Sequence, residues 1–172
     1  QKNYPDTKSD LYSAFIEKCF NWTTKNGYSA MMTPFTWMFI TTHEKLRKHI
    51  ISRGSISSLI QLEYSAFEDA TVPLCTFVLQ NQKYDTVGVY VRLSDFKGGM
   101  DVQAEKIKEV VMHNNNDNKF VIDDENFNII PGAPIAYWIG NFKIFDFEKI
   151  EQKYVSGGRT KTHNNDKYVR KW

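Results

Sequence analysis

Residues 9–62 decide the fold, and they read SDLYSAFIEKCFNWTTKNGYSAMMTPFTWMFITTHEKLRKHIISRGSISSLIQL. Ser9 or Asp10 can cap a helix whose apolar side chains recur every three or four residues, and Asn26-Gly27 provides its stop. These apolar side chains are Leu11, Phe15, Ile16, Cys19 and Phe20. The next run, residues 28–33, is apolar or small and stops at Pro34, which predicts a strand covered on both faces.

A second helix and strand follow in the same stretch. Thr41 and Glu44 have capping-box spacing, and an apolar face formed by Leu46, Ile50 and Ile51 precedes Gly54, where we expect the helix to end. Residues 56–62 then predict another strand. A helix, strand, helix, strand order indicates an α/β layer architecture with a mainly parallel sheet.

Two further strand-like runs lie beyond this stretch, at residues 72–80 and 86–93. The polar segment 81–85 between them predicts an antiparallel hairpin that closes the sheet. Past Gly98-Gly99 the character of the sequence changes, so we place a boundary after residue 97 and expect a small α+β segment over residues 98–150.

That segment begins with a predicted helix at residues 102–112. The polar run 114–118 predicts a surface loop. A turn at residues 131–134 then leads into the aromatic run 135–138 and a short helix near residues 142–150.

Composition limits the possible classes of protein. A chain of 172 residues has room for one domain with a hydrophobic core, or for one domain with an appended subdomain. A net charge of +2 is too small to indicate nucleic-acid binding by bulk electrostatics, although the segment after residue 149 has a local basic excess. Cys19 and Cys75 lie in apolar runs, where a free thiol behaves as a small buried apolar group. No apolar run approaches the roughly 20 residues of a membrane span. We therefore expect a cytoplasmic protein.

The common catalytic motifs are missing from this sequence. It contains no phosphate-binding Walker loop and no nucleophile elbow, and its four histidines are not paired at metal-ligand spacing. We therefore expect no metal. Composition and periodicity alone leave the function open.

Four segments, in order, resemble the later conserved motifs of the gamma-class DNA methyltransferases that modify the exocyclic nitrogen of adenine. The run DLYSAFIEKC resembles the helix after the family's catalytic loop, and NGYSAMMTPFTWMF resembles the next strand. The run EKLRKHIISRGSISSLIQL resembles the following helix and strand, and EYSAFEDATVPLCTFVL the loop and strand that face the target base. The rest of the chain, through IPGAPIAYWI and GGRTKTHNNDKYVRKW, is similar to large methylases of phage-exclusion (BREX) and type IIG restriction-modification systems.

The resemblance implies a fold and a division of the chain. The fold is the C-terminal half of a Rossmann-like, S-adenosylmethionine-dependent methyltransferase sheet. Residues 1–97 would belong to the catalytic domain, residues 98–150 would connect it, and residues 151–172 would begin a target-recognition region.

Site residues carried over from the family are expectations of the same kind. Phe15 matches the position that packs against the adenine of S-adenosylmethionine, and a packing role on the apolar face of its helix is an equal alternative. Phe67 matches the aromatic that stacks on the flipped target adenine. Pro34 and Trp37 would lie near the site, where Trp37 can equally be a core residue. Tyr137 and Trp138 are expected to pack rather than to contact bases. Candidate contacts with DNA phosphates are Arg159, Lys161, Asn164, Asn165, Lys167 and Arg170, for which a solvated tail is an equal alternative.

The departures from the family pattern matter as much as the matches. The Gly-rich cofactor loop, the acidic ribose-binding residue and the Asn/Asp-Pro-Pro-Tyr motif precede the first matched helix in the family, and none occurs in these 172 residues. The adenine amino nitrogen is a poor nucleophile because its lone pair is delocalised, and that motif supplies the acceptors that orient it. We therefore expect an inactive fragment whose partners are double-stranded DNA, the remainder of its polypeptide and other defence-system proteins. Self-association across an exposed sheet edge is also expected.

Two other readings stay open at this point. The chain can be a non-catalytic DNA-binding or assembly module of a defence complex. It can also be an unrelated α/β enzyme with a similar helix and strand pattern, and the order of the strands in the sheet would reveal that case.

Overall fold

The computed structural model describes residues 7, 10–64, 66–67, 72–83, 87–112, 117–139, 148 and 153. Gln1–Phe142 forms one compact unit and Lys143–Trp172 a second. The described elements all lie in the first unit, which extends past residue 97 to residue 142.

Three α-helices, five β-strands and three 3-10 turns make up the described part of the chain. In chain order they are α1 (Leu11–Trp22), β1 (Tyr28–Pro34), η1 (Phe35–Met38), η2 (Thr41–His43), α2 (Glu44–Arg53), β2 (Ser55–Gln61), β3 (Leu74–Gln80), β4 (Gly88–Arg92), α3 (Gly99–Met112), β5 (Lys119–Ile122) and η3 (Asp124–Ile129).

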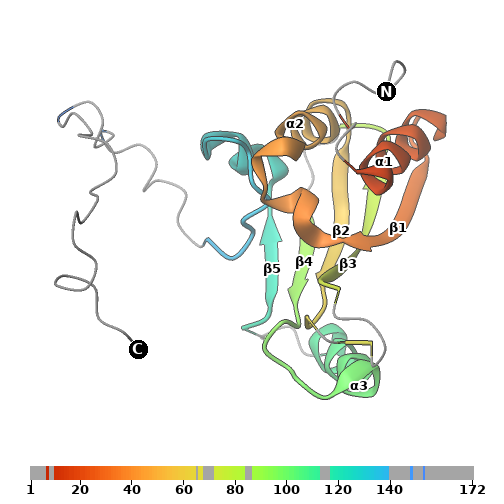
Figure 1. Ribbon diagram of the computed structural model, residues 1–172, viewed down its shortest axis with the longest axis vertical. Helices are drawn as coiled ribbons and strands as arrows, with labels where there is room; N and C mark the ends of the chain where they lie inside the picture. Colours follow the sequence, from red (N-terminus) through yellow and green to blue (C-terminus); the bar gives the residue numbers. More distant parts are fainter. Residues whose placement is uncertain are drawn as a thin grey trace, which may run out of the picture. The chain divides into compact units, whose positions relative to one another are not determined.

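The strands form one mixed sheet in the order β1-β3-β2-β4-β5 (Figure 1). β3 is antiparallel to both β1 and β2, β4 is parallel to β2, and β5 is antiparallel to β4. β1, β2 and β4 therefore run in one direction, and β3 and β5 run in the other. The expected α/β class is confirmed, but the expectation of a mainly parallel sheet is wrong.

The predicted hairpin of the third and fourth strands is also wrong. β3 enters between β1 and β2, and β4 lies on the far side of β2. A short polar connection is compatible with both arrangements, because β3 and β4 run in opposite directions either way. β3 is the strand whose side chains Cys75, Phe77 and Leu79 are buried, and pairing on both sides satisfies its backbone along its whole length.

The two faces of the sheet are covered differently. One face carries the main core, in which Ile16 and Phe20 of α1 and Ile50 of α2 pack with Leu59 and Phe77 of the sheet. The other face is covered by α3, through a smaller cluster formed by Leu62, Ala66, Val91, Leu93 and Val110. In Figure 1, α1 and α2 lie near one end of the strands and α3 lies near the other.

β1 is an edge strand, with β3 on one side. Its side chains alternate between exposed and more buried positions, and Tyr28 and Met32 are 62% and 49% exposed. The expectation of a strand covered on both faces is therefore wrong. A run of small and apolar residues does not reveal which strand takes the edge, because that depends on the other strands.

The ends of the two first helices differ in detail from the prediction. α1 begins after Asp10, whose side chain makes no capping hydrogen bond, and ends at Trp22 rather than at Asn26-Gly27. α2 begins at Glu44, because Thr41 starts the separate turn η2 and makes no cap. The capping-box prediction is therefore wrong, whereas Gly54 does end α2 as predicted.

Candidate functional site

The C-terminal ends of β1, β2 and β4 lie together at one end of the sheet, because these strands run in the same direction. We call this end, where the three strands finish, the carboxyl edge of the sheet. The backbone N–H of Leu93 donates to the Gln61 carbonyl at 2.9 Å, which joins the ends of β4 and β2. Crevices at the carboxyl ends of parallel strands are the usual ligand sites of α/β sheets. This edge is therefore the candidate functional site.

Phe67 lies in the loop that follows β2 at this edge, and its side chain is 37% exposed. The base of this loop is held by Gln103 of α3, which is 2% exposed. The Glu63 N–H donates to Oε1 of Gln103 at 3.2 Å, and Nε2 of Gln103 donates to the Phe96 carbonyl at 2.6 Å. Gln103 thus joins the loops that follow β2 and β4. Nothing in the sequence points to Gln103, since a single glutamine on a helix carries no motif.

Pro34 ends β1, as expected, and Trp37 follows in η1. Trp37 is fully buried and its indole packs edge-on against Phe77, with ring centroids 5.1 Å apart. Burial raises the pKa of the Cys75 thiol beside them to about 12, so this cysteine is an unreactive core residue. The core role of Trp37, which the sequence left as an alternative, fits this burial.

Phe15 lies on the outer side of α1, where it is 48% exposed. Leu11 and Trp22, at helical spacing from it, are 76% and 72% exposed. The apolar face of α1 is thus narrower than the sequence predicted, since Ile16 and Phe20 reach the core and Phe15 does not. The Phe15 ring is therefore accessible to a ligand.

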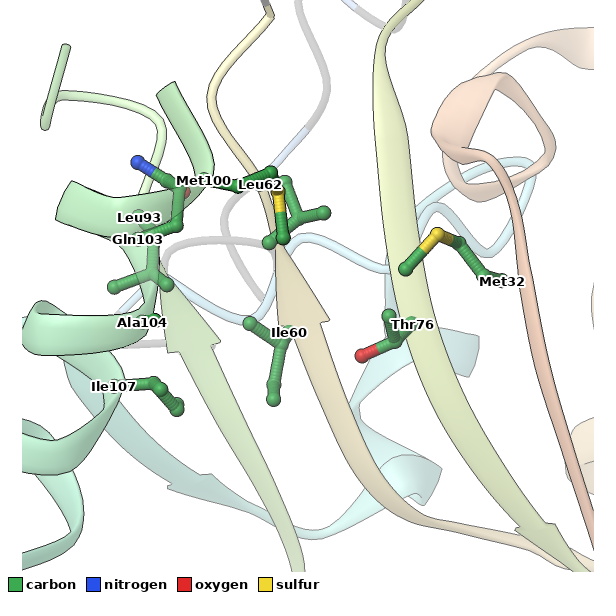
Figure 2. Close-up of a pocket in the computed structure, with 9 residues that line it drawn as sticks. All are labelled: Met32, Ile60, Leu62, Thr76, Leu93, Met100, Gln103, Ala104 and Ile107. Atoms are coloured by element: carbon green, nitrogen blue, oxygen red, sulfur yellow. The ribbon is translucent and has the colours of Figure 1, made fainter. Parts of the chain in front are cut away.

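An apolar pocket of about 220 Å³ lies beside the edge, between the sheet and α3 (Figure 2). Met32 of β1, Ile60 of β2 and Thr76 of β3 form the sheet side, and Met100 and Ile107 line it from α3. The pocket is built for aliphatic groups rather than for a charged cofactor, because its lining carries no charged side chain.

The turn at residues 131–134 is fixed to α2 by one buried side chain, Arg47. Its guanidinium donates to the carbonyls of Gly132, Ala133, Trp37 and Ile40 at 2.6 to 3.2 Å. Gly132 and Ala133 have positive φ angles of 83° and 46°, a conformation that costs free energy at an alanine. Arg47 stabilises this conformation because both of their carbonyls accept from it.

The fixed turn positions the aromatic residues that follow it. Tyr137 is fully buried, stacks on Tyr90 at 5.2 Å and donates to Oε1 of Gln61 at 2.7 Å. Its predicted packing role fits this position. The next residue, Trp138, is instead 38% exposed.

A buried carboxyl group, Asp124, lies behind this aromatic stack. It accepts hydrogen bonds from the Ile56 N–H at 2.6 Å and from the Tyr90 hydroxyl. Burial raises the pKa of Asp124 to about 6, and it also raises the pKa of Tyr90. The pair ties η3 to β2 and β4, so its role is structural.

Several predictions from the sequence lie outside the described residues. Among them are the helix near 142–150 and all six candidate phosphate contacts, Arg159, Lys161, Asn164, Asn165, Lys167 and Arg170. The described ranges contain no cluster of three or more His, Cys, Asp or Glu side chains that suits a metal ion. None of the helices in those ranges has the length and apolar character needed to cross a membrane.

Comparison with solved structures identifies the class of fold. The type I restriction-modification system methyltransferase subunit from Streptococcus thermophilus superposes with a TM-score of 0.61 and 18% sequence identity, over 76% of this chain and 30% of that one. The chain therefore shares its α/β fold with part of that methyltransferase subunit.

Comparison of sequences finds relatives along nearly the whole chain. Residues 1–67 match the model of the Eco57I restriction-modification methylase family. The chain is 32% identical over 179 aligned residues to the adenine-specific methyltransferase PglX of Lacticaseibacillus casei (strain Zhang), and 28% identical to the adenine-specific methyltransferase BrxX of Escherichia coli O9:H4 (strain HS). It is thus homologous to one segment of the adenine-specific methyltransferases, as its sequence indicated. The chain spans 15% of the length of the first relative and 14% of the second.

Proposed function

We propose that the intact polypeptide containing this chain transfers a methyl group from S-adenosylmethionine to N6 of adenine in DNA. The proposed biological setting is restriction-modification or defence against phage. The observation that carries this proposal is the 32% identity to an adenine-specific methyltransferase, which extends over 99% of the chain. The exposed aromatic ring at the carboxyl edge of the sheet supports it, because a base-modifying site needs such a surface.

Phe67 is the residue to which we assign contact with the target base. A base that has left the duplex has lost its stacking partners, and an aromatic plane restores about 1 to 3 kcal/mol per base. The Phe67 side chain is partly exposed, and Gln103 anchors the start of its loop. The chain itself would therefore hold the adenine, while the acceptors that activate its amino nitrogen come from elsewhere in the polypeptide.

The cofactor contact proposed for this chain is limited to Phe15. Its ring is accessible on α1, which suits packing against the adenine of S-adenosylmethionine. A single apolar ring cannot hold the ribose and the charged methionine part, which need hydrogen-bonding partners. We propose that the isolated chain neither binds the cofactor tightly nor turns over.

The first test is a tritium-transfer assay of the intact polypeptide beside the 172-residue chain, with labelled S-adenosylmethionine and unmethylated genomic DNA. Label on adenine from the intact polypeptide alone is the expected result. DNA binding without label from either protein would instead favour the second reading of the sequence, a non-catalytic DNA-binding or assembly module.

A second test addresses Phe67 in the intact polypeptide. Phe67→Ala should weaken binding to a duplex with a mismatched, easily flipped target adenine by about 1 to 3 kcal/mol, whereas Phe67→Trp should retain affinity. With an abasic target there is no ring to stack on, so wild type and Phe67→Ala should bind alike. Tyr64→Ala, which removes a 56% exposed ring from the same loop, is the matched control. Equal affinities of Phe67→Ala and wild type for the mismatched duplex would refute the assignment.

A further inference from the structure

Trp138 is a half-exposed tryptophan held in a fixed position by three neighbours. Its ring centroid lies 5.5 Å from that of Phe39 and 5.1 Å from that of Tyr137. The guanidinium carbon of Arg92 lies 5.6 Å from the same indole centroid, a cation–π contact. Trp138 is 38% exposed although Tyr137 beside it is fully buried, so the turn presents one ring to the core and the next to solvent.

These side chains meet at the candidate functional edge. Arg92 is the last residue of β4, and Phe39 follows η1 beyond the end of β1. The Ile135 N–H donates to the Met38 carbonyl at 2.9 Å, which brings the segment before Trp138 to the end of η1. The Trp138 and Arg92 pair therefore lies on the same edge of the sheet as the loop that carries Phe67.

Arg92 is oriented as well as exposed. Its Nε donates to the Ser94 hydroxyl at 2.9 Å, and its Nη2 lies 3.8 Å from a carboxylate oxygen of Asp95. The side chain remains 37% exposed. An oriented guanidinium beside an accessible ring suits a phosphodiester, because Arg binds phosphate oxygens with its planar N–H groups while the ring packs on the adjoining sugar or base.

We propose that Trp138 and Arg92 form a second DNA contact, in which Arg92 binds one backbone phosphate and Trp138 packs on the adjoining nucleotide. This inference rests on the proposed function, because DNA is the substrate that it assigns. The contact positions the duplex and differs from that of Phe67, which holds the target base. It binds without regard to sequence, because only the backbone and a ring face are used.

The test measures DNA affinity of the intact polypeptide against salt concentration. Arg92→Gln should weaken binding several-fold and reduce the slope of log K against log salt by about 0.9, the value for one phosphate contact with B-DNA. Arg92→Lys should retain the slope. Trp138→Ala should weaken binding several-fold without changing the slope, and Trp138→Phe should restore part of the loss.

The chain provides matched controls at the opposite edge of the sheet. Arg53 lies with its guanidinium carbon 5.9 Å from the Phe20 centroid, and Trp22 lies with Lys18 Nζ 4.5 Å from its ring. Both residues precede the beginnings of the parallel strands, away from the candidate site. Arg53→Gln and Trp22→Ala should leave affinity and salt slope unchanged.

Each outcome bears on the proposal separately from the proposed function. A wild-type protein that methylates DNA, with Arg92→Gln and Trp138→Ala binding like the two controls, would overturn the inference and leave the function intact. Failure of the wild-type protein to bind DNA would overturn both. If Trp138→Ala lowers the melting temperature, its weaker binding is not used as evidence. The decision then rests on Arg92→Gln, which should keep the wild-type melting temperature and show the smaller salt slope.

Discussion

At the scale of single residues, buried polar groups hold together the loops of this fold. Asp124 is the clearest case, since its two oxygens accept from the backbone of β2 and from a hydroxyl of β4. Burial disfavours its charged form, which is why its pKa is raised. A raised pKa in the folded state means that the folded protein binds this proton more tightly than the unfolded chain does.

The first prediction concerns the pH dependence of stability and follows from the upward shift of the Asp124 pKa. Because the folded pKa is about 6 and the usual value is 3.8, the contribution of Asp124 is fully present below about pH 4 and is lost as the pH rises through 6. The asparagine side chain of the Asp124→Asn variant does not titrate, so this variant lacks the pH-dependent contribution. The stability of wild type relative to Asp124→Asn should therefore fall between pH 4 and pH 6, by at most about 3 kcal/mol. Urea unfolding of both proteins across this range measures the difference, and a constant difference would contradict the shift.

The second prediction concerns the stability of the Arg47→Met variant. The guanidinium is 1% exposed and its acceptors are all backbone carbonyls, which the methionine would leave unpaired. We expect a loss of roughly 3 kcal/mol in the free energy of unfolding. Lys48→Met on the same helix removes an exposed cation and should change stability by less than about 1 kcal/mol. Denaturant titration compares the two, and a similar small loss in both would show that water replaces the Arg47 contacts.

At the scale of elements, the connection between α2 and β2 is closely packed against two other elements. A Cβ atom added at Gly54 would lie 2.3 Å from the Gln80 carbonyl oxygen and 2.6 Å from Cζ of Phe20. α2, α1 and β3 therefore meet at a residue without a side chain. The sequence predicts Gly54 to be a helix stop, but the close approach of two other elements is what requires glycine there.

The third prediction is that Gly54→Ala destabilises the fold by about 1 to 3 kcal/mol, because backbone and an aromatic ring would both have to move. Ser52→Ala, at an exposed position two residues earlier, is the control and should change little. Thermal unfolding followed by circular dichroism measures both. Equal melting temperatures of Gly54→Ala and the control would contradict the crowding seen at Gly54.

At the scale of the whole molecule, β1 forms one of the two edges of the sheet, and one face of the sheet is only partly covered. β1 pairs on one side, and the hollow beside it, about 390 Å³, is lined by Ala30, Met32, Ser58, Ile60 and Val78 together with other residues of β1 and β3. α3 covers the other end of this face. Unpaired edge strands that carry apolar side chains promote association.

The fourth prediction is that the isolated chain self-associates through β1 and that Met32→Lys weakens this association. Met32 is 49% exposed on the edge strand, so a lysine there places a charge at the contact without opening the core. Val111→Lys, at a 69% exposed position of α3, is the control. Analytical ultracentrifugation over a concentration series should show a larger monomer fraction for Met32→Lys alone. A monomeric wild-type chain would refute the prediction.

Consecutive residues were enough to predict most of the described helices and strands and the class of fold. Helical spacing from Leu11 to Phe20 and from Leu46 to Ile51, and apolar runs between turn residues, predicted α1, α2, α3 and β1 to β4 close to their observed bounds. The motif order predicted the relationship to adenine-specific methyltransferases and the loop in which Phe67 lies. These are local properties, because a helix face, a strand run and a motif are each written in consecutive residues.

The neighbours of each strand and the contacts between distant residues became known from the three-dimensional structure alone. The place of β3 between β1 and β2, the edge position of β1 and the exposure of Phe15 all depend on pairing between distant segments. The same holds for Gln103 beneath the Phe67 loop and for the contact between Arg92 and Trp138, which lie 46 residues apart in the sequence. Their side chains carry no local periodicity, because each is fixed by a partner far along the chain.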